Sequence, residues 1–296
     1  MRVHAFPFEA MASRCELRLA LPPGVAGAAL AQVAIDEVRR IERTFSRYRA
    51  DSIVARINAA AGQHAVACDD ETNALLDYAG VLHASSGGLF DITSGVLRRA
   101  WDFRRPVLPA QAALDALLPL VGWRHVQRAD GAIRLAQVGM EIDFGGFGKE
   151  YAADRAAALL SSAGVRHGYV NLGGDLRIIG PQPDGTAWSI GVQDPRAAEG
   201  LAAAIPIASG ALATSGDYER FIDVGGRRYC HVLDPRSGMP VSHWRSVSVL
   251  GPLAIAAGSC STIAMLMQED GLAFLDQSGM AYLAIDQQGQ CFRKDV

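Results

Sequence analysis

The sequence has no Cys-x-x-Cys pair, and its five cysteines are scattered at positions 15, 68, 230, 260 and 291. An odd number of widely separated cysteines fits neither a disulfide framework nor a zinc site. Residues 1–15 also lack the basic start and apolar core of a secretory signal, and Arg14 before Cys15 does not fit a lipoprotein signal. We therefore expect reduced thiols and a cytoplasmic location.

Runs of lysine or arginine are also missing, and the formal net charge is -3. Nucleic acid is therefore not an expected partner. No apolar stretch is long enough to cross a bilayer, because the most apolar segment, residues 201–213, is interrupted by Pro206 and Gly210. We expect no membrane span.

What the sequence does contain is typical of a globular protein with a sizeable core: 50% hydrophobic and 20% charged residues. A chain of 296 residues can form one large domain or two ordinary ones. It shows no fixed-period repeat, low-complexity tract or flexible linker. The sequence therefore predicts one domain covering residues 1–296.

Hydrophobic periodicity predicts a mixture of helices and strands. Helical spacing occurs over residues 30–45, 70–86, 109–122, from about Lys149 onward, and around 261–267. Asp69 or Asp70 can cap the second of these helices. Strand patterns occur at residues 15–21, 168–172, 176–180, 188–192, 246–251 and 281–286, with a hairpin over 131–145 turning near Gln137 to Gly139. Because strands and helices do not alternate regularly, we predict an α+β fold of mixed, mainly antiparallel sheets with packed helices.

The segment 143–154, "DFGGFGKEYAAD", combines glycines with a lysine at a predicted helix start. It is not a Walker loop, which needs glycine at Asp143 and serine or threonine at Glu150, nor a dinucleotide fingerprint, which needs glycine at Tyr151. Helix-start amides attract anions, and glycines let a ligand approach the backbone. Lys149 could neutralise a phosphate or hold Asp143; the alternative is a tight turn with a surface lysine.

Three further loops place glycines beside an acid or a histidine: "GGLFDITSGVL" with Asp91, "NLGGDL" with Asp175, and "CHVLDPRSGMPV" with His231. A histidine at a strand end can act as a general base, although a lone histidine is more often packed and hydrogen-bonded. Four such loops exceed what turns alone require. We interpret them as parts of one site.

Seven segments, in order, resemble the ApbE family, the FAD:protein FMN transferases, along nearly the whole chain. They are "MAS" (11–13) for the family's Met-Gly-Thr, "FSRYRADSIVARIN", "GGLFDITSGVLRRAWDF", "IDFGGFGKEYAAD" for Asp-Leu-Gly-x-x-x-Lys-Gly-Tyr-x-x-Asp, "VNLGGDL", "TSGDYER" and "HVLDPRSGMP". The resemblance implies an ApbE-like fold. It also implies transfer of FMN from FAD to a threonine or serine hydroxyl of a target flavoprotein, with release of AMP.

The same resemblance implies which residues form the site. FAD would be bound by positions matching Met11, Tyr48, Phe90, Asp91, Ile92, Asp143, Lys149 and Val232. We expect His231 to act near the reacting phosphate, as a base or as a positioning hydrogen-bond donor.

A departure from the family pattern concerns Mg²⁺. The family's metal-binding Asp-x-x-x-Thr corresponds here to "GSCST", so Gly258 replaces the acid. Thr262 and a backbone carbonyl at about Gly146 remain of that metal site. We expect Gly258→Asp to raise metal affinity, unless Gly258 has a positive φ that makes a side chain costly. The alternatives to transfer are an FAD-binding carrier or sensor, and an FAD pyrophosphatase.

Overall fold

An eight-stranded antiparallel sheet organises the computed structural model, which describes residues 1–295 apart from the side chain of Ala198. The strands lie in the order β1-β2-β6-β7-β10-β13-β14-β15. Their bounds are β1 Arg2–Ala10, β2 Ser13–Leu21, β6 Gly168–Leu172, β7 Asp175–Gly180, β10 Ala211–Gly216, β13 Trp244–Gly251, β14 Ala281–Asp286 and β15 Cys291–Lys294. Every neighbouring pair is antiparallel.

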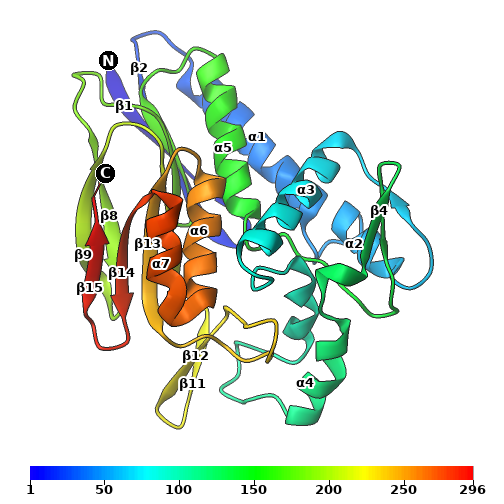
Figure 1. Ribbon diagram of the computed structural model, residues 1–296. Helices are drawn as coiled ribbons and strands as arrows, with labels where there is room; N and C mark the ends of the chain where they lie inside the picture. Colours follow the sequence, from blue (N-terminus) through cyan, green and yellow to red (C-terminus); the bar gives the residue numbers. More distant parts are fainter. Residues whose placement is uncertain (296) are drawn as a thin grey trace.

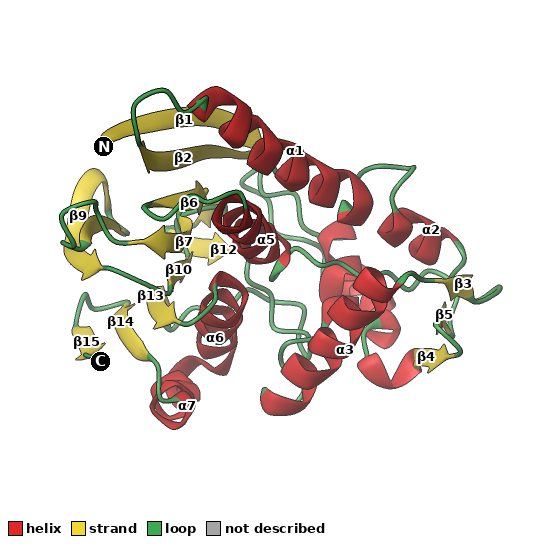
Figure 2. Ribbon diagram, turned by 90° about the horizontal axis from the view of Figure 1, so that it is seen from above, coloured by secondary structure: helices red, strands yellow, loops and turns green. Residues whose placement is uncertain are grey.

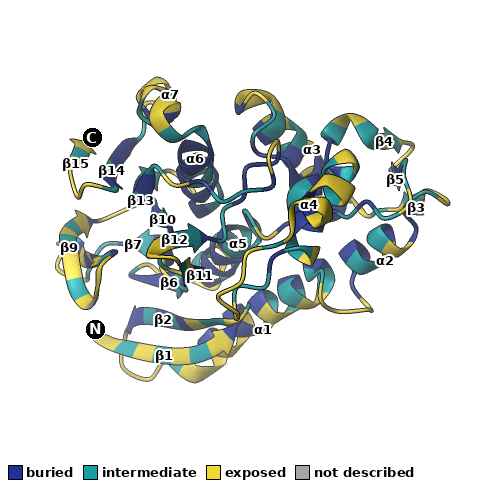
Figure 3. Ribbon diagram, turned by 90° about the horizontal axis from the view of Figure 1, so that it is seen from below, coloured by how far each residue is buried: buried dark blue, intermediate teal, exposed yellow. Residues whose placement is uncertain are grey.

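Helices cover one face of this sheet (Figure 2). They are α1 Gly27–Phe45, α5 Gly148–Ser162, α6 Ala254–Met267 and α7 Gly271–Ser278. The hairpin of β8 (Trp188–Asp194) and β9 (Ala197–Ile207) covers the other face, where Trp188 and Ile190 pack against Tyr169 and Leu176. Figure 3 shows the consequence: α6 and β13 are buried along most of their length, whereas β1 and β9 are largely exposed.

The chain between α1 and α5 forms a second region beside the helix layer (Figure 1). It contains α2 Ile53–Ala59, α3 Asp70–Ser85, the 3-10 helix Ile92–Arg99, α4 Gln111–Leu117, and a small sheet of β3 Val66–Ala67, β4 Val126–Ala129 and β5 Ala132–Leu135. A further hairpin pairs β11 Phe221–Val224 with β12 Arg227–Cys230. One hydrophobic cluster joins residues of the main sheet, its helices and this second region.

The predicted fold class, α+β with mainly antiparallel sheets and packed helices, is confirmed. In β2 the alternation is real, because Cys15, Leu17 and Leu19 are buried while the intervening side chains are not. In α1 the residues at helical spacing, Ala34, Val38 and others, face the core. Asp69 caps α3 through the backbone N–H of Thr72, 2.8 Å away, as its position predicted.

The predicted hairpin over residues 131–145 is wrong in its second half. A turn does form near Gly139, but the segment Met140–Phe144 pairs with no strand. Its alternating residues are buried, and the side chain of Asn58 replaces a neighbouring strand: Asn58 donates to the carbonyl of Ile142 and accepts from its N–H, at 3.0 and 2.7 Å. β5 pairs instead with β4.

Two predicted helices have different bounds. α6 begins at Ala254 rather than near residue 261, and the helix predicted over 109–122 ends as an α-helix at Leu117. Pro119 lies in the 3-10 turn that follows, Leu118–Leu120. Proline cannot donate the next α-helical hydrogen bond, so the helix changes its geometry there.

No helix in residues 1–295 is both long and apolar enough to span a bilayer. All five cysteines are free thiols, and Cys15 and Cys230 are buried.

Candidate functional site

One cavity of about 550 Å³ is lined by residues of the β1–β2 turn, the second region, α5 and α6. All the residues that the sequence suggested line it: Met11, Tyr48, Phe90, Asp91, Ile92, Asp143, Gly146, Lys149, His231, Val232 and Thr262. Its volume falls within the ordinary range for cofactor and ligand sites. The four glycine-containing loops therefore meet around one hollow, which the separate motifs could only suggest.

The mouth and wall of the cavity are partly aromatic. Tyr48 is 78% exposed at the rim, with the guanidinium of Arg47 5.7 Å from its ring centroid. Phe90 is buried and packs directly on Gly146: a Cβ added to Gly146 would lie 2.7 Å from Phe90 Cζ. Glycine is required at position 146 because the ring occupies the space of a side chain.

The N-terminus of α5 opens into the same cavity through Gly148 and Lys149. The N-cap residue, Phe147, forms no capping side-chain hydrogen bond within the described part of the chain. The first N–H groups of a helix have no partner within the helix and carry a partial positive charge. An anion in the cavity can therefore accept hydrogen bonds from the backbone here.

Lys149 pairs with Asp175, their Nζ and Oδ2 atoms 2.7 Å apart, and does not hold Asp143. Its side chain is 32% exposed and that of Asp175 only 4%, so the interpretation of Lys149 as a surface lysine is wrong. Burial lowers the pKa of Lys149, but the charges of Asp175 and Glu150 outweigh this effect and raise it. Lys149 is therefore a fixed positive charge.

The carboxylates of Asp91 and Asp143 are held by the protein itself. Asp91 accepts from the N–H and hydroxyl of Thr93 at 2.8 and 2.6 Å and from the N–H of Trp123 at 2.9 Å. Asp143 accepts from the N–H of Gly145 at 2.8 Å and from Arg47 at 3.3 Å. Both acids thus shape the loops of the wall.

Arg98 and Arg220 add positive charge that sequence reasoning missed. Both line the cavity, and within residues 1–295 neither forms an ion pair with a carboxylate. Burial lowers the pKa of Arg98, which shows that its charge is poorly solvated. Both arginines lie inside segments that resemble the family, residues 87–103 and 214–220, but the resemblance gave them no role. Their meeting depends on the path of the chain between them.

His231 follows β12 and faces the same arginines. Burial, followed by the charges of Arg98 and Arg220, lowers its pKa to about 3. Its buried Nδ1 atom has no hydrogen-bond partner among the described residues. The imidazole is therefore neutral at physiological pH. An anion entering between the two arginines would offset their charges and raise this pKa.

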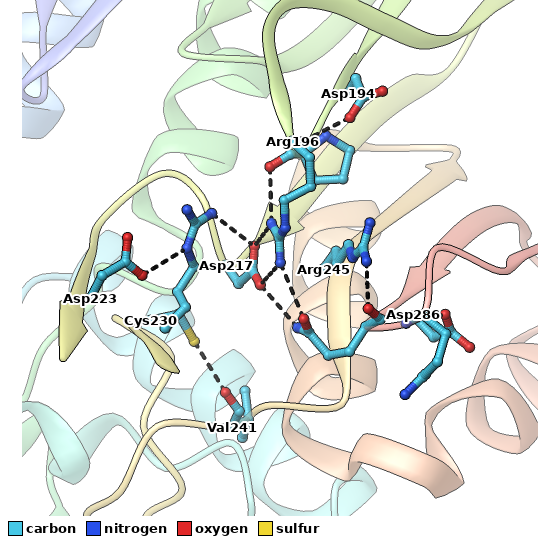
Figure 4. Close-up of polar contacts among 12 residues, drawn as sticks. Asp194, Arg196, Asp217, Asp223, Cys230, Val241, Arg245 and Asp286 are labelled. Atoms are coloured by element: carbon cyan, nitrogen blue, oxygen red, sulfur yellow. Dashed lines mark hydrogen bonds and ion pairs between the residues drawn. The ribbon is translucent and has the colours of Figure 1, made fainter. Parts of the chain in front are cut away.

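A buried polar network supports the loop that carries Arg220. Figure 4 shows Asp217 at its centre. Asp217, 3% exposed, accepts from two nitrogens of Arg196 at 2.7 Å each and from Gln287 at 2.9 Å. The network ties the β8–β9 hairpin and the C-terminal hairpin to the segment after β10. Charge-assisted bidentate bonds of this kind fix geometry well.

Several residues that line the cavity carry oxygen atoms that suit a hard cation. The hydroxyls of Thr262 and Ser215 are 3.0 Å apart, and Gly146 and Glu150 line the same cavity. The hydroxyl of Ser261 is committed to the protein, since it donates to the carbonyl of Val247 at 2.8 Å.

No group of three or more His, Cys, Asp or Glu side chains that could hold a metal occurs within residues 1–295. Mg²⁺ commonly keeps several waters and is held by one or two carboxylates together with substrate phosphates. Among the carboxylates that line the cavity, that of Glu150 is 6% exposed and its Oε2 has no partner among the described residues. Burial raises the pKa of Glu150. The donor set fits a cation that is completed by a phosphate-containing ligand.

Comparisons with known proteins agree over most of the chain. The model of the ApbE family matches residues 11–284. The chain is 28% identical to an FAD:protein FMN transferase of Vibrio cholerae, covering 89% of this chain and 81% of the relative. It is 32% identical to one of Klebsiella pneumoniae, covering 84% and 79%.

Solved structures show the same similarity. The crystal structure of the ApbE protein from Thermotoga maritima superposes with a TM-score of 0.92 at 30% identity, covering 99% of this chain and 97% of that one. The flavinyl transferase ApbE of Pseudomonas stutzeri, in its apo form, gives a TM-score of 0.88 at 29% identity, covering 99% and 95%.

Proposed function

This chain belongs to the ApbE family, and from that membership we propose that it is an FAD:protein FMN transferase. It would take FAD as substrate and attach FMN to a threonine or serine hydroxyl of an acceptor flavoprotein, releasing AMP. Relatives named as FAD:protein FMN transferases, at 27–33% identity, support this proposal.

The observation that carries the proposal is the positive lining of the cavity. Arg98 and Arg220 have no carboxylate partner in the described chain, Lys149 is a fixed charge, and the uncapped start of α5 lies beside it. Arg98 is half-buried and burial lowers its pKa, and a positive charge withdrawn from water is costly unless a ligand compensates it. A pyrophosphate supplies that compensation, and FAD carries one between its two nucleotide halves.

The transfer step requires an attacking hydroxyl, a leaving group and a base. The acceptor's hydroxyl oxygen forms a bond to the phosphorus of the FMN half. The bond from that phosphorus to the bridging oxygen breaks, and AMP leaves with the bonding electrons. The hydroxyl proton must pass to a base. Stabilising charge on the phosphates and positioning the two reactants are the main requirements of such a reaction.

His231 is the residue that we propose for the proton. It is neutral, and its Nδ1 atom has no partner in the described chain. A pKa of about 3 makes it a weak base when no anion is bound, because burial disfavours the charged imidazolium and because Arg98 and Arg220 repel a proton. A bound pyrophosphate would neutralise those arginines, so the imidazole becomes more basic when substrate is present.

We also propose that a divalent cation assists. Bound near Thr262 and the carbonyl of Gly146, Mg²⁺ would neutralise charge on the phosphate oxygens. The side chains that line the cavity would shield the phosphates from bulk water and align them with the acceptor hydroxyl.

Incubation with FAD, Mg²⁺ and an acceptor flavoprotein tests the proposal by mass spectrometry. A mass gain of one FMN on the acceptor, with AMP released, is the expected result. Formation of FMN and AMP without an adduct would replace the proposal by an FAD pyrophosphatase. Unchanged FAD despite tight binding would replace it by an FAD carrier or sensor.

A further inference from the structure

Two unusual residues of this sequence touch in the structure. Glu150 on α5 occupies the position of glycine in the family's Lys-Gly-Tyr motif. Gly258 on α6 occupies the position of the acid in the family's Asp-x-x-x-Thr motif. A Cβ built on Gly258 would lie 2.5 Å from Oε1 of Glu150, 2.6 Å from its Cγ and 2.9 Å from its Cδ. The Glu150 carboxyl group thus fills the space that a side chain at position 258 would enter.

This contact corrects the expectation about Gly258. Gly258 lies inside α6 and does not have the positive φ that would make a side chain costly. The obstacle to an aspartate at this position is Glu150. Separations below 3 Å are shorter than real carbon contacts, so a single Gly258→Asp change forces Glu150 out of place.

The surroundings of the Glu150 side chain are those expected of a residue that binds a metal ion. It is 6% exposed, lines the cavity, and its Oε2 has no hydrogen-bond partner among residues 1–295. A buried carboxylate oxygen without a partner costs about 1–3 kcal/mol or more. This cost is removed when a bound ligand supplies the missing interaction with Oε2.

Two neighbouring polar groups do not bond to this oxygen, because each has another partner. Lys149, the next residue, is bonded to Asp175 at 2.7 Å. The Tyr78 hydroxyl is directed to Ser259 at 2.9 Å. Among the other residues that line the cavity, Thr262 and Ser215 carry hydroxyl oxygens that are 3.0 Å apart, and such oxygens suit a hard cation.

We propose that Glu150 is the anionic ligand of a divalent cation of the Mg²⁺ class, so that α5 supplies the carboxylate that α6 lacks at Gly258. The cation would lie between Glu150, the Thr262 hydroxyl and the Gly146 carbonyl, and phosphate oxygens of the nucleotide would complete its shell. This inference rests on the proposed function for the identity of the nucleotide. Because one carboxylate gives little charge, metal binding is expected to depend on FAD.

The test measures Mn²⁺ binding by electron paramagnetic resonance, with FAD present and absent. Wild-type protein should bind Mn²⁺ with FAD and only weakly without it. Glu150→Gln keeps the shape of the side chain and removes its charge, so it should lower Mn²⁺ affinity by about tenfold or more. Glu219→Gln is the matched control: Glu219 also lines the cavity, and its loss should leave Mn²⁺ affinity within about twofold.

The transposed variant gives a second, independent result. Gly258→Asp alone should lower the melting temperature, since the new side chain meets Glu150. Glu150→Gly combined with Gly258→Asp returns one carboxylate to the same space from the other helix. It should recover both the melting temperature and Mn²⁺ binding in the presence of FAD.

Wild-type Mn²⁺ affinity in Glu150→Gln, or no Mn²⁺ binding by the wild type with FAD, would overturn the inference. If Glu150→Gln does not fold, the transposed variant decides, since its failure to bind Mn²⁺ while folded and binding FAD overturns the inference equally. Failure of the proposed function is a separate outcome: Mn²⁺ binding that depends on Glu150, with no FMN transfer to any acceptor.

Discussion

Lys149 and Asp175 form an ion pair that the fold largely removes from water, with side chains 32% and 4% exposed. Removing one partner leaves the other charge buried and alone, which is more costly than removing both. The lysine therefore contributes to stability as well as to the positive lining of the cavity.

We predict that Lys149→Ala lowers the free energy of unfolding by about 2 kcal/mol and weakens FAD binding. Denaturant melts and flavin fluorescence titration measure the two effects. The double variant Lys149→Ala, Asp175→Asn should regain much of the stability and none of the FAD affinity. A single variant that melts like the wild type would show that the pair is unimportant for folding.

His231 links the stability of the protein to pH. Its pKa is about 3 in the folded chain and about 6.5 when unfolded. Between these values the unfolded state binds more protons, so the stability contributed by neutral His231 is complete above about pH 6.5 and is lost as pH falls toward 3.

We predict that His231→Gln flattens this dependence. Compared with the wild type, the variant should lose less stability between pH 7.5 and pH 5, because glutamine does not titrate. Urea melts of both proteins at the two pH values give the comparison, and all other titrating groups cancel in the difference. Parallel pH dependences would place the neutral, buried state of His231 in doubt.

At the scale of elements, the turn between β1 and β2 is strained. Ala10 pairs with Ser13, so the turn has two residues, Met11 and Ala12, and both have positive φ, 52° and 55°. This is the turn that matches the twist of a hairpin, but a residue with a Cβ adopts it at a cost of about 1–2 kcal/mol.

We predict that Ala12→Gly raises the free energy of unfolding by about 1 kcal/mol, since glycine adopts positive φ freely. Thermal and denaturant melts measure it. Ala20→Gly, in the regular and buried part of β2, is the control and should be destabilising. A loss of stability in Ala12→Gly would mean that the strain is relieved by contacts of the Ala12 methyl group.

Asp154, in the middle of α5, joins this helix to the start of α6. Its two carboxylate oxygens accept from the backbone N–H groups of Ala254 and Ile255, both at 2.9 Å. A side chain of one helix thus caps the start of another, and α6 carries Gly258 and Thr262 into the site. Leu253 at the N-cap position offers no side-chain acceptor of its own.

We predict that Asp154→Ala lowers the free energy of unfolding by about 1–2 kcal/mol and speeds hydrogen exchange at the start of α6. Arg177→Gln is the control, because Arg177 contacts Asp154 at 3.2 Å without touching the helix end. It should leave exchange at Ala254 and Ile255 nearly unchanged. Equal effects of the two changes would assign the loss to the ion pair.

At the scale of the whole molecule, the cavity receives residues from the β1–β2 turn, the second region, α5, the β10–β11 loop and α6. The Asp217 network holds the loop of Arg220 against the two hairpins behind it. The positive charges come from segments far apart in the chain. These charges line one cavity only when the whole chain is folded.

We predict that FAD binds more tightly than FMN or riboflavin, by about tenfold or more. The reason is that the pyrophosphate can form charge-assisted bonds with Arg98 and Arg220, each worth about 1.5–3 kcal/mol. Fluorescence titration gives the affinities, with competition by ADP against AMP as the test of the pyrophosphate alone. Equal affinity for FAD and FMN would contradict a pyrophosphate site.

The sequence by itself determined what depends on local order along the chain. Helical spacing in α1, alternation in β2 and the cap at Asp69 follow from which side chains neighbour each other, so each could be predicted. The order of seven short segments likewise indicated the family and the positions of the site residues.

Only the tertiary structure decided which distant groups meet. The alternation of Met140–Phe144 predicted a strand, but the side-chain amide of Asn58 took the hydrogen bonds of the missing partner. The fold also brings Arg98 and Arg220 to one cavity, where neither has a carboxylate partner in the described chain. Glu150 and Gly258 lie 108 positions apart, yet one fills the space of the other. Residue type is read along the chain, whereas burial, charge pairing and steric overlap arise only from distances in the folded molecule.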